Sequence, residues 1–280
     1  MTGDKSVFPK KSLVLFAAQA LIAIGLLGNR AVEVMDRGPR RSKGRQKMAR
    51  MKRIVVPGLP HHVTQRGVRR CETFLDVHDR EVYERLLLCH CERYSLAVLA
   101  YCWMTTHIHM VAVPEYEASL ALVLRDTNGL YAVYFNRKYG FTGHLWQARF
   151  YSCVLDESHF WTAVRYVERN PVRAKMVLRA EDYRWSSAAA HCLRRQDPLL
   201  TDLGSIPPLI ADWSMWLADE EDPAELAAIR RNTGTGRPWG DKAFLEKLEA
   251  RLGRPVTPQK RGRKPQSQSV LSTLSNRREA

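Results

Sequence analysis

Two histidines flank one isoleucine in an apolar stretch of the chain. Residues 99–114 read LAYCWMTTHIHMVAVP, and the β-branched residues around His107 and His109 predict a buried strand. Side chains two residues apart on a strand project from the same face, so both imidazoles point one way while Ile108 packs into the opposite layer. Imidazole is the commonest metal ligand near neutral pH, so the pattern predicts two ligands of a divalent ion that activates a phosphate or a carbonyl. A buried histidine pair without metal is the alternative.

A tyrosine and an asparagine lie one helical turn apart further along the chain. Residues 164–174 read VRYVERNPVRA, which places Tyr166 and Asn170 four positions apart on one face of a helix. If that face packs near the two histidines, Asn170 supplies a third metal ligand and Tyr166 lies beside whatever the ion binds. The alternative is an ordinary core tyrosine followed by an asparagine that ends its helix before a proline.

The segment between these two patterns combines cations, an amide and aromatic rings. Such side chains bind single-stranded or distorted nucleic acid through phosphate contacts and base stacking. The first predicted strand and the residues after it add further histidines and arginines. The residues assigned to DNA contact are His61, His62, Arg66, Arg69, Arg70, His144, Trp146, Gln147 and Arg149.

The charge of the whole chain also favours a polyanionic partner. Its 280 residues carry a formal net charge of +15 at pH 7 and are 45% hydrophobic, so the chain can bury a core and still present a basic surface. Nucleic acid and an anionic membrane are the partners that such a charge favours. The six cysteines include no CxxC pair, which argues against a structural zinc module and is typical of reduced thiols in the cytoplasm.

The hydrophobic patterns predict a compact domain from about residue 53 onward. Strands are expected at 61–66, 95–104 and 107–113 and at the end of 143–155, and helices at 79–94, 118–137, 157–169, 223–231 and 241–252. The third of these helices is expected to stop at Asn170-Pro171, because proline cannot continue a helix. The order of the first seven elements is typical of an α+β fold, a ferredoxin-like antiparallel sheet with packed helices.

Four segments, in this order and spacing, resemble the single-tyrosine HUH transposases and specifically their REP-associated branch: PGLPHHVTQRG, CWMTTHIHMVAVP, FNRKYGFTGHLWQARFYS and RYVERNPVRAKMV. The resemblance implies an HUH endonuclease fold, with His107 and His109 as metal ligands, Tyr166 as nucleophile and Asn170 as third ligand. The turn before the histidines is Thr105-Thr106, where Pro-Asn or Pro-Asp is common in the family.

The resemblance also implies a function and its partners. It implies a metal-dependent transposase that cleaves and rejoins single-stranded DNA through a 5′-phosphotyrosine intermediate, at REP-like hairpins, with Mg²⁺ or Mn²⁺ as cofactor. Single-stranded or hairpin DNA is the expected partner, with no obligatory protein partner, and the protein is expected to be a monomer or a homodimer. Two alternatives stay open: a replication-initiator-type HUH nickase with the same site, and a DNA-binding protein whose nuclease site is idle.

We divide the chain into an N-terminal extension at 1–50, a transposase domain at 51–192, a helical extension at 193–255 and a basic tail at 256–280. The apolar run 13–28 follows two lysines and is shorter than a spanning helix, which needs about 20 apolar residues. An export signal, a membrane anchor and an extension upstream of a natural start near Met48 are the three interpretations. We favour the last, because an enzyme of nucleic acid has no need of export, and expect a cytoplasmic, nucleoid-associated protein.

The tail contains Arg261 and Arg263 on either side of a glycine, in the segment KRGRKP. This resembles an AT-hook, in which arginines lie in a narrow minor groove of DNA. A solvated basic tail is the alternative.

Deletion of the residues after Val256 should weaken DNA binding and flatten its salt dependence. Each phosphate contact that is lost lowers the slope of log K against log salt by roughly 1. A titration of DNA binding at several salt concentrations measures both effects, and unchanged binding throughout would show that the tail is only solvated.

Overall fold

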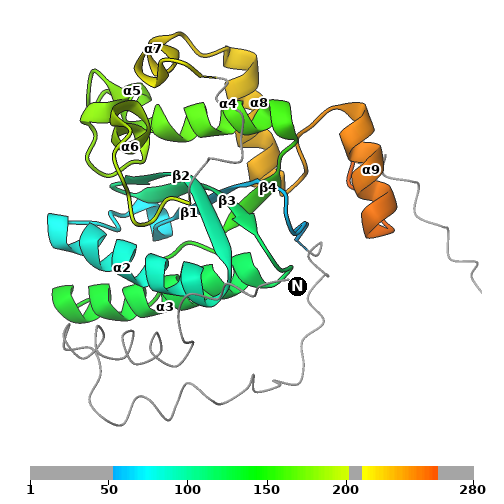
Figure 1. Cartoon of the computed structure of the whole chain (residues 1–280). Helices are drawn as coiled ribbons and strands as arrows, with labels where there is room; N and C mark the ends of the chain where they lie inside the picture. The colour runs from blue at the N-terminus through cyan, green and yellow to red at the C-terminus, as the bar shows by residue number, and fades with distance from the viewer. Residues whose placement is uncertain (1–52, 202–209, 258–280) are drawn as a thin grey trace, which may run out of the picture.

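The computed structural model of the chain describes residues 53–201 and 210–257. Figure 1 shows three layers: the helices α2 and α3 on one face of a sheet, the sheet itself, and the helices α4 and α8 on the other face. Within the described ranges no helix is long and apolar enough to cross a bilayer. The apolar run 13–28 and the arginines Arg261 and Arg263 lie outside these ranges.

The sheet has four strands in the order β2-β3-β1-β4, and every neighbouring pair is antiparallel. The strands are β1 at His61–Arg66, β2 at Leu96–Met104, β3 at His107–Pro114 and β4 at Tyr151–Val154. This is the strand order of the ferredoxin-like βαββαβ fold, in which the first and third strands are central. The predicted α+β fold class is therefore confirmed.

Helices cover both faces of the sheet. They are α2 at Val77–Arg93, α3 at Ser119–Tyr139, α4 at Glu157–Glu168, α5 at Asn170–Arg173, α6 at Ala188–Leu193, α7 at Trp213–Ala218, α8 at Pro223–Thr235 and α9 at Lys242–Leu252. Five of them begin after an aspartate whose carboxylate accepts a hydrogen bond from an amide of the first turn, as N-caps do. These caps are Asp76, Asp156, Asp212, Asp222 and Asp241.

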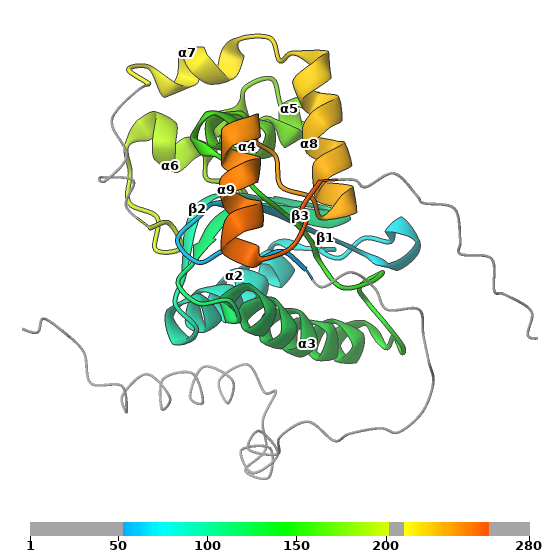
Figure 2. The ribbon, with the colours of Figure 1, turned by 90° about the vertical axis from the view of Figure 1, so that its right-hand side faces the viewer.

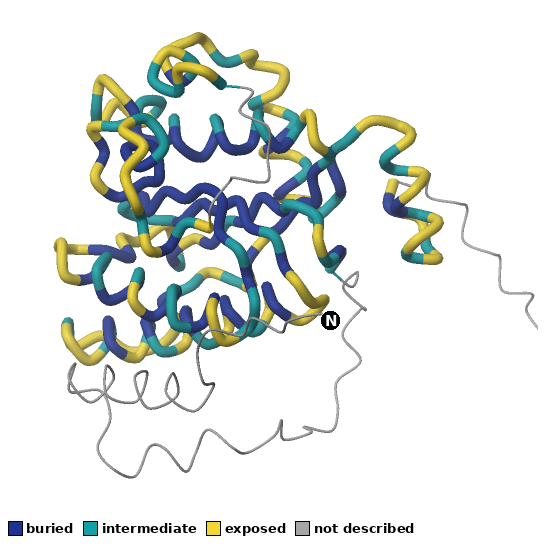
Figure 3. Tube along the Cα trace, in the orientation of Figure 1, coloured by how far each residue is buried: buried dark blue, intermediate teal, exposed yellow. Residues whose placement is uncertain are grey.

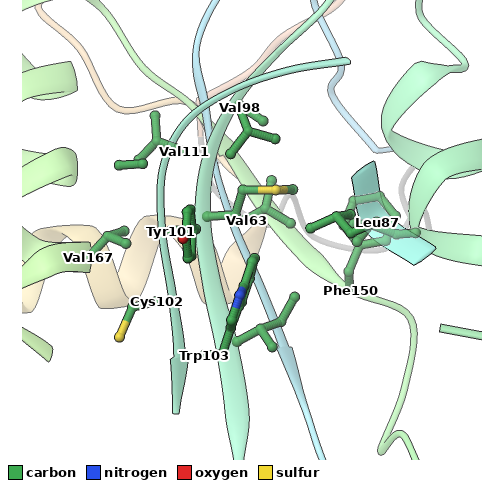
Figure 4. Close-up of a cluster of buried hydrophobic side chains, with 14 of the residues drawn as sticks. Val63, Leu87, Val98, Tyr101, Cys102, Trp103, Val111, Phe150 and Val167 are labelled. Atoms are coloured by element: carbon green, nitrogen blue, oxygen red, sulfur yellow. The ribbon is translucent and has the colours of Figure 1, made fainter. Parts of the chain in front are cut away.

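The strands of the sheet are mostly buried (Figure 3). In the close-up of Figure 4, Val63, Tyr101 and Trp103 lie on the side of α2, whereas Cys102 and Val111 lie on the side of Val167 in α4. The alternation follows from the pleat, since neighbours along a strand point to opposite faces. The face that packs on α4 is also the face that carries His107 and His109, because Cys102 pairs with His109 in the ladder.

Helix α4 ends at Glu168, close to the predicted stop at Asn170-Pro171, but a short helix, α5, begins directly afterwards at Asn170. Pro171 occupies the first turn of α5, where the missing N–H of proline has no partner to lose. The amides of Arg173 and Ala174 donate to the carbonyls of Arg169 and Asn170 at 2.9 and 3.0 Å. Asn170 therefore stays one helical turn beyond Tyr166.

The segment after residue 192 packs on the sheet, and both edges of the sheet are bonded by later parts of the chain. At the β4 edge, the amide of Trp239 donates to the carbonyl of Val154 at 2.8 Å. At the β2 edge, the amide of Trp103 donates to the carbonyl of Trp185 at 2.8 Å. Helix α8 lies beside α4 on the sheet, as Figure 2 shows from the side. It runs to Thr235, four residues beyond the predicted end, and the added turn reaches β1 and β4.

A buried carboxylate ties α4 to this later part of the chain. Glu168, the last residue of α4, is fully buried and accepts hydrogen bonds from Ser187, His191 and Trp213. The His191 Nδ1 and Trp213 Nε1 atoms lie 2.6 and 2.7 Å from its oxygens. The residue two positions before it is Tyr166, so this network fixes the end of the helix that carries the tyrosine.

Replacing Glu168 with alanine should lower the free energy of unfolding by about 3 kcal/mol, because it leaves the buried Ser187 hydroxyl and the half-buried rings of His191 and Trp213 without an acceptor. Urea unfolding at neutral pH measures the loss. Glu92→Ala, at an exposed position of α2, is the control and should change stability by less than ~0.5 kcal/mol. Equal losses in the two variants would contradict a structural role for the buried carboxylate.

Candidate active site

Three rings meet on the α4 face of the sheet. The ring of Tyr166 lies 5.5 Å, centroid to centroid, from both His62 of β1 and His109 of β3, edge-on in each case. The two histidine rings are stacked at 5.3 Å, and His62 Nε2 lies 3.0 Å from His109 Nδ1. His62 and His109 project from the same face because Thr64, two residues after His62, pairs with His109.

The predicted metal ligands His107 and His109 are neighbours on this face, with ring centroids 4.9 Å apart. In each ring a hydrogen bond engages Nδ1. His107 Nδ1 lies 2.9 Å from the hydroxyl oxygen of Thr106, and His109 Nδ1 is bonded to His62. Nε2 is therefore the nitrogen of each ring that is left for a ligand.

The histidines of the site are neutral at pH 7. Burial, helped by the charge of Arg66, lowers the pKa of His107 to about 4. Burial lowers the pKa of His62 to about 3, and burial together with the two neighbouring imidazoles holds the pKa of His109 well below its usual range. A neutral imidazole keeps the lone pair that binds a metal ion. The pKa shifts thus leave His107 and His109 in the state that metal ligation needs.

The third predicted ligand, Asn170, is buried, and its Nδ2 donates to the carbonyl of Tyr166 at 3.2 Å. That bond uses the amide nitrogen and leaves Oδ1 as an acceptor. In the described ranges, no three residues drawn from histidine, cysteine, aspartate and glutamate gather as a metal site. The predicted third ligand is therefore of another type, the amide oxygen of Asn170, one helical turn beyond Tyr166.

Two arginines lie over the tyrosine ring, and the sequence reasoning missed both. The guanidinium of Arg173 is 4.2 Å from the ring centroid of Tyr166, and that of Arg230 is 5.9 Å away. Glu221 holds Arg173 through contacts of 2.7 and 2.8 Å and also pairs with Arg169 at 3.1 Å. Arg173 follows Tyr166 by seven residues, a spacing that returns to the same helix face and could have indicated it. Arg230 and Glu221 carry no such signal, because they reach the site from a distant part of the chain.

The residues assigned to DNA contact gather beside His107. The carbonyl of Arg66, the partner of His107 in the β-ladder, accepts a hydrogen bond from the amide of Gln147 at 2.9 Å, which joins the two predicted segments. Gly67 allows a close approach of the backbone there, since an added Cβ would lie 2.5 Å from the carbonyl oxygen of Cys71. The exposed members of this basic strip are Arg66, Arg69, Arg70, His144, Gln147 and Arg149.

Three of the assigned residues are not free to contact DNA. His61 is fully buried, and its ring nitrogens bond the carbonyl of Leu59 at 2.7 Å and the amide of Val56 at 3.2 Å. His62 belongs to the ring cluster described above. Trp146 packs against core tyrosines and donates to the carbonyl of Asn128 at 3.0 Å. We therefore correct the prediction that these three rings contact DNA, because their polar atoms are hydrogen-bonded inside the protein.

Two other tyrosines of the domain, Tyr151 and Tyr183, have different surroundings. Tyr183 is buried, and its hydroxyl donates to the carbonyl of Trp103 at 2.9 Å. Tyr151 is 42% exposed on β4 and pairs with Thr64 in the ladder. Tyr166, by contrast, has ring contacts to both His62 and His109.

Comparison with known proteins assigns the class. Residues 56–170 match the sequence profile described as "Transposase IS200 like". A solved structure of a REP-associated tyrosine transposase bound to a REP hairpin is similar, with 18% identity, a TM-score of 0.45, and coverage of 55% of this chain and 92% of that one. A crystal structure of a candidate transposase from Deinococcus radiodurans R1 has 16% identity, a TM-score of 0.30, and coverage of 46% and 97%. A search of curated protein sequences finds no match.

The segment that carries the histidines and the tyrosine is therefore that of a transposase, a class of enzymes that process DNA. Residues 56–170 belong to the IS200-like transposase family.

The buried ring of His61 predicts a loss of stability in acid. Burial lowers the pKa of His61 from 6.5 to about 4, so the unfolded chain takes up the proton first as the pH falls. The contribution of neutral His61 is complete above pH 6.5 and is lost between pH 6.5 and 4, with about 2 kcal/mol gone at pH 5.

Urea unfolding of the wild type and of His61→Gln at pH 7.5 and pH 5 measures this loss. The stability difference between the two proteins should shrink by about 2 kcal/mol at the lower pH. His144→Gln is the control, since that ring is exposed. A His61→Gln difference that stays constant across the two pH values would contradict the assignment.

Proposed function

We propose that the protein is a metal-dependent transposase that cleaves and rejoins single-stranded DNA through a phosphotyrosine at Tyr166. The observation that carries the proposal is the packing of the Tyr166 ring at 5.5 Å from His109, whose Nε2 is left for a ligand. His107 lies beside it with the same nitrogen available. A nucleophile and two metal-binding nitrogens thus lie on one face of the sheet.

The donor set fits Mg²⁺ or Mn²⁺. His107, His109 and the Oδ1 of Asn170 would hold the ion, two nitrogens and one oxygen, and the nitrogens favour Mn²⁺ as a substitute. Bound there, the ion supplies Lewis-acid polarisation of a non-bridging oxygen of the scissile phosphate.

The phenol oxygen of Tyr166 attacks the phosphorus atom and forms a P–O bond, which joins the tyrosine to the 5′-phosphate of the strand downstream of the break. The bond between phosphorus and the 3′ oxygen breaks, and that oxygen leaves as a 3′-OH. The phenol loses one proton and the 3′ oxygen gains one, so the reaction consumes no water. Because the phosphodiester energy is kept in the phosphotyrosine, the reverse attack by another 3′-OH rejoins the DNA.

The arginines over the tyrosine supply fixed positive charge. Arg173 is 16% exposed at its side chain and is held by Glu221 and by the carbonyl of Tyr166, so its guanidinium cannot move far. Preorganised cations stabilise negative charge as it develops on the phosphate and the attacking oxygen. Arg230 is exposed and extends this charge toward the incoming strand.

The substrate class follows from the strip next to His107. Exposed arginines and Gln147 lie next to the start of β3, where His107 is. Such a strip suits single-stranded DNA that passes over the site. One similar solved structure is of a REP-associated transposase bound to a REP hairpin, which supports a hairpin with a single-stranded flank as the substrate to try first.

Tyr166→Phe should abolish the covalent adduct with DNA while folding and DNA binding survive, because the change removes one oxygen and little volume. The measurement is a denaturing gel of the protein with a 3′-labelled hairpin oligonucleotide and Mn²⁺. The label stays with the 5′-phosphotyrosyl product and shifts with the protein.

Tyr151→Phe is the matched control and should keep the adduct. His107→Ala should lose it by loss of metal. An adduct that persists in Tyr166→Phe and vanishes in Tyr151→Phe would overturn the assignment of the nucleophile. DNA binding by the wild type without cleavage in any metal would instead favour a DNA-binding protein with an idle site.

A further inference from the structure

A chain of hydrogen bonds runs from helix α8 to a proposed metal ligand. The hydroxyl oxygen of Thr233 lies 2.7 Å from Nδ1 of His62, and Nε2 of His62 lies 3.0 Å from Nδ1 of His109. Thr233 and His62 are each 2% exposed and His109 is 6% exposed, so water does not replace these bonds. The chain joins three elements that are distant in sequence.

The bonds allow two arrangements of hydrogen atoms. Each neutral imidazole carries one N–H, so the chain runs either from His109 to Thr233 or in the opposite direction. In the first, His109 Nδ1–H donates to His62 and His62 Nδ1–H donates to the Thr233 oxygen. In the second, Thr233 donates to His62, His62 donates to His109, and the remaining hydrogen of His109 sits on Nε2.

Only the first arrangement leaves a lone pair on Nε2 of His109, the nitrogen that would bind the ion. The second puts a hydrogen there and blocks ligation. A hydroxyl that accepts from His62 Nδ1 therefore favours the tautomer of His109 that binds metal, since a partner on one ring nitrogen decides which nitrogen is free.

We propose that Thr233 and His62 are positioning residues that fix the metal-binding tautomer of His109, so that helix α8 is part of the catalytic centre. This inference rests on the proposed function. Thr233 lies outside residues 56–170, the segment that the family profile covers, and so outside anything that the family match describes.

Helix α8 is held firmly enough for this task. Ile229, one turn before Thr233, is fully buried in the main core. Before the helix, Glu221 binds Arg169 and Arg173, and after it Trp239 pairs with the β4 edge. The Thr233 hydroxyl is thus anchored from both ends of its helix.

The test is the affinity of the metal-free full chain for Mn²⁺, measured from the free-ion signal in electron paramagnetic resonance. Thr233→Val keeps the shape of the side chain and removes the hydroxyl, and we expect the Kd for Mn²⁺ to rise about tenfold. Thr233→Ser restores the hydroxyl and should bind as the wild type does. Thr235→Val is the matched control, because that exposed hydroxyl bonds the carbonyl of Arg231 in its own helix at 2.9 Å.

A merely structural role for Thr233 would lower the thermal stability of Thr233→Val without changing the Mn²⁺ affinity of the folded protein, and that result would overturn the inference. If Thr233→Val does not fold, the ¹⁵N chemical shifts of the histidine rings, measured by NMR on the wild type with Mg²⁺, show which ring nitrogens carry hydrogen. Hydrogen on Nδ1 of both His62 and His109 supports the inference, and hydrogen on Nε2 of His62 overturns it. A wild type that binds no Mn²⁺ and forms no adduct would instead overturn the proposed function.

Discussion

The pairing of β1 with β3 fixes which side chains of the sheet face helix α4. Thr64 lies opposite His109 and Arg66 opposite His107, so the pleat carries His62, His107 and His109 to one face. A shift of the pairing register by one residue would move the side chains of a whole strand to the other face, toward α2 and α3. The register is secured by Val63, Ile108 and Met110, which fill the opposite face and are fully buried. The geometry of the site is therefore a consequence of core packing.

The site combines neutral donors with fixed cations. Burial keeps the imidazoles uncharged, and the bonds from His62 to Thr233 and to His109 satisfy polar atoms that would otherwise be costly to bury. Arg173 brings positive charge to the same place, and the carboxylate of Glu221 compensates it. Imidazole nitrogens and a guanidinium therefore lie beside the Tyr166 ring on one face of the sheet.

The part of the chain after residue 192 belongs physically to the fold that carries the site. Its helix α8 covers β1 and β4, Glu221 before α8 binds Arg169 and Arg173, and Trp239 occupies the edge of β4. Residues 185–187 occupy the edge of β2 in a similar way. Exposed strand edges pair readily with other chains, and here both edges are engaged by the chain itself. The domain boundary at 192 stays a prediction, but Arg230 and Thr233 reach the site from beyond it.

The sequence by itself determined the elements and the two histidines of β3, because a strand's alternation and a helix's turn are local and are set by spacing. It placed β1 at 61–66 as found, and the helix of Tyr166 within a residue of its observed end at Glu168. It did not show that a second, short helix begins at Asn170, since a proline is tolerated in a first turn as well as after a helix end. Only the tertiary structure decided that His61 and His62 are internal. It also decided that Arg230 lies over the ring of Tyr166, Glu221 beside Arg173 and Thr233 beside His62. Those contacts join residues up to 171 positions apart, and no local pattern records which distant helix covers which strand.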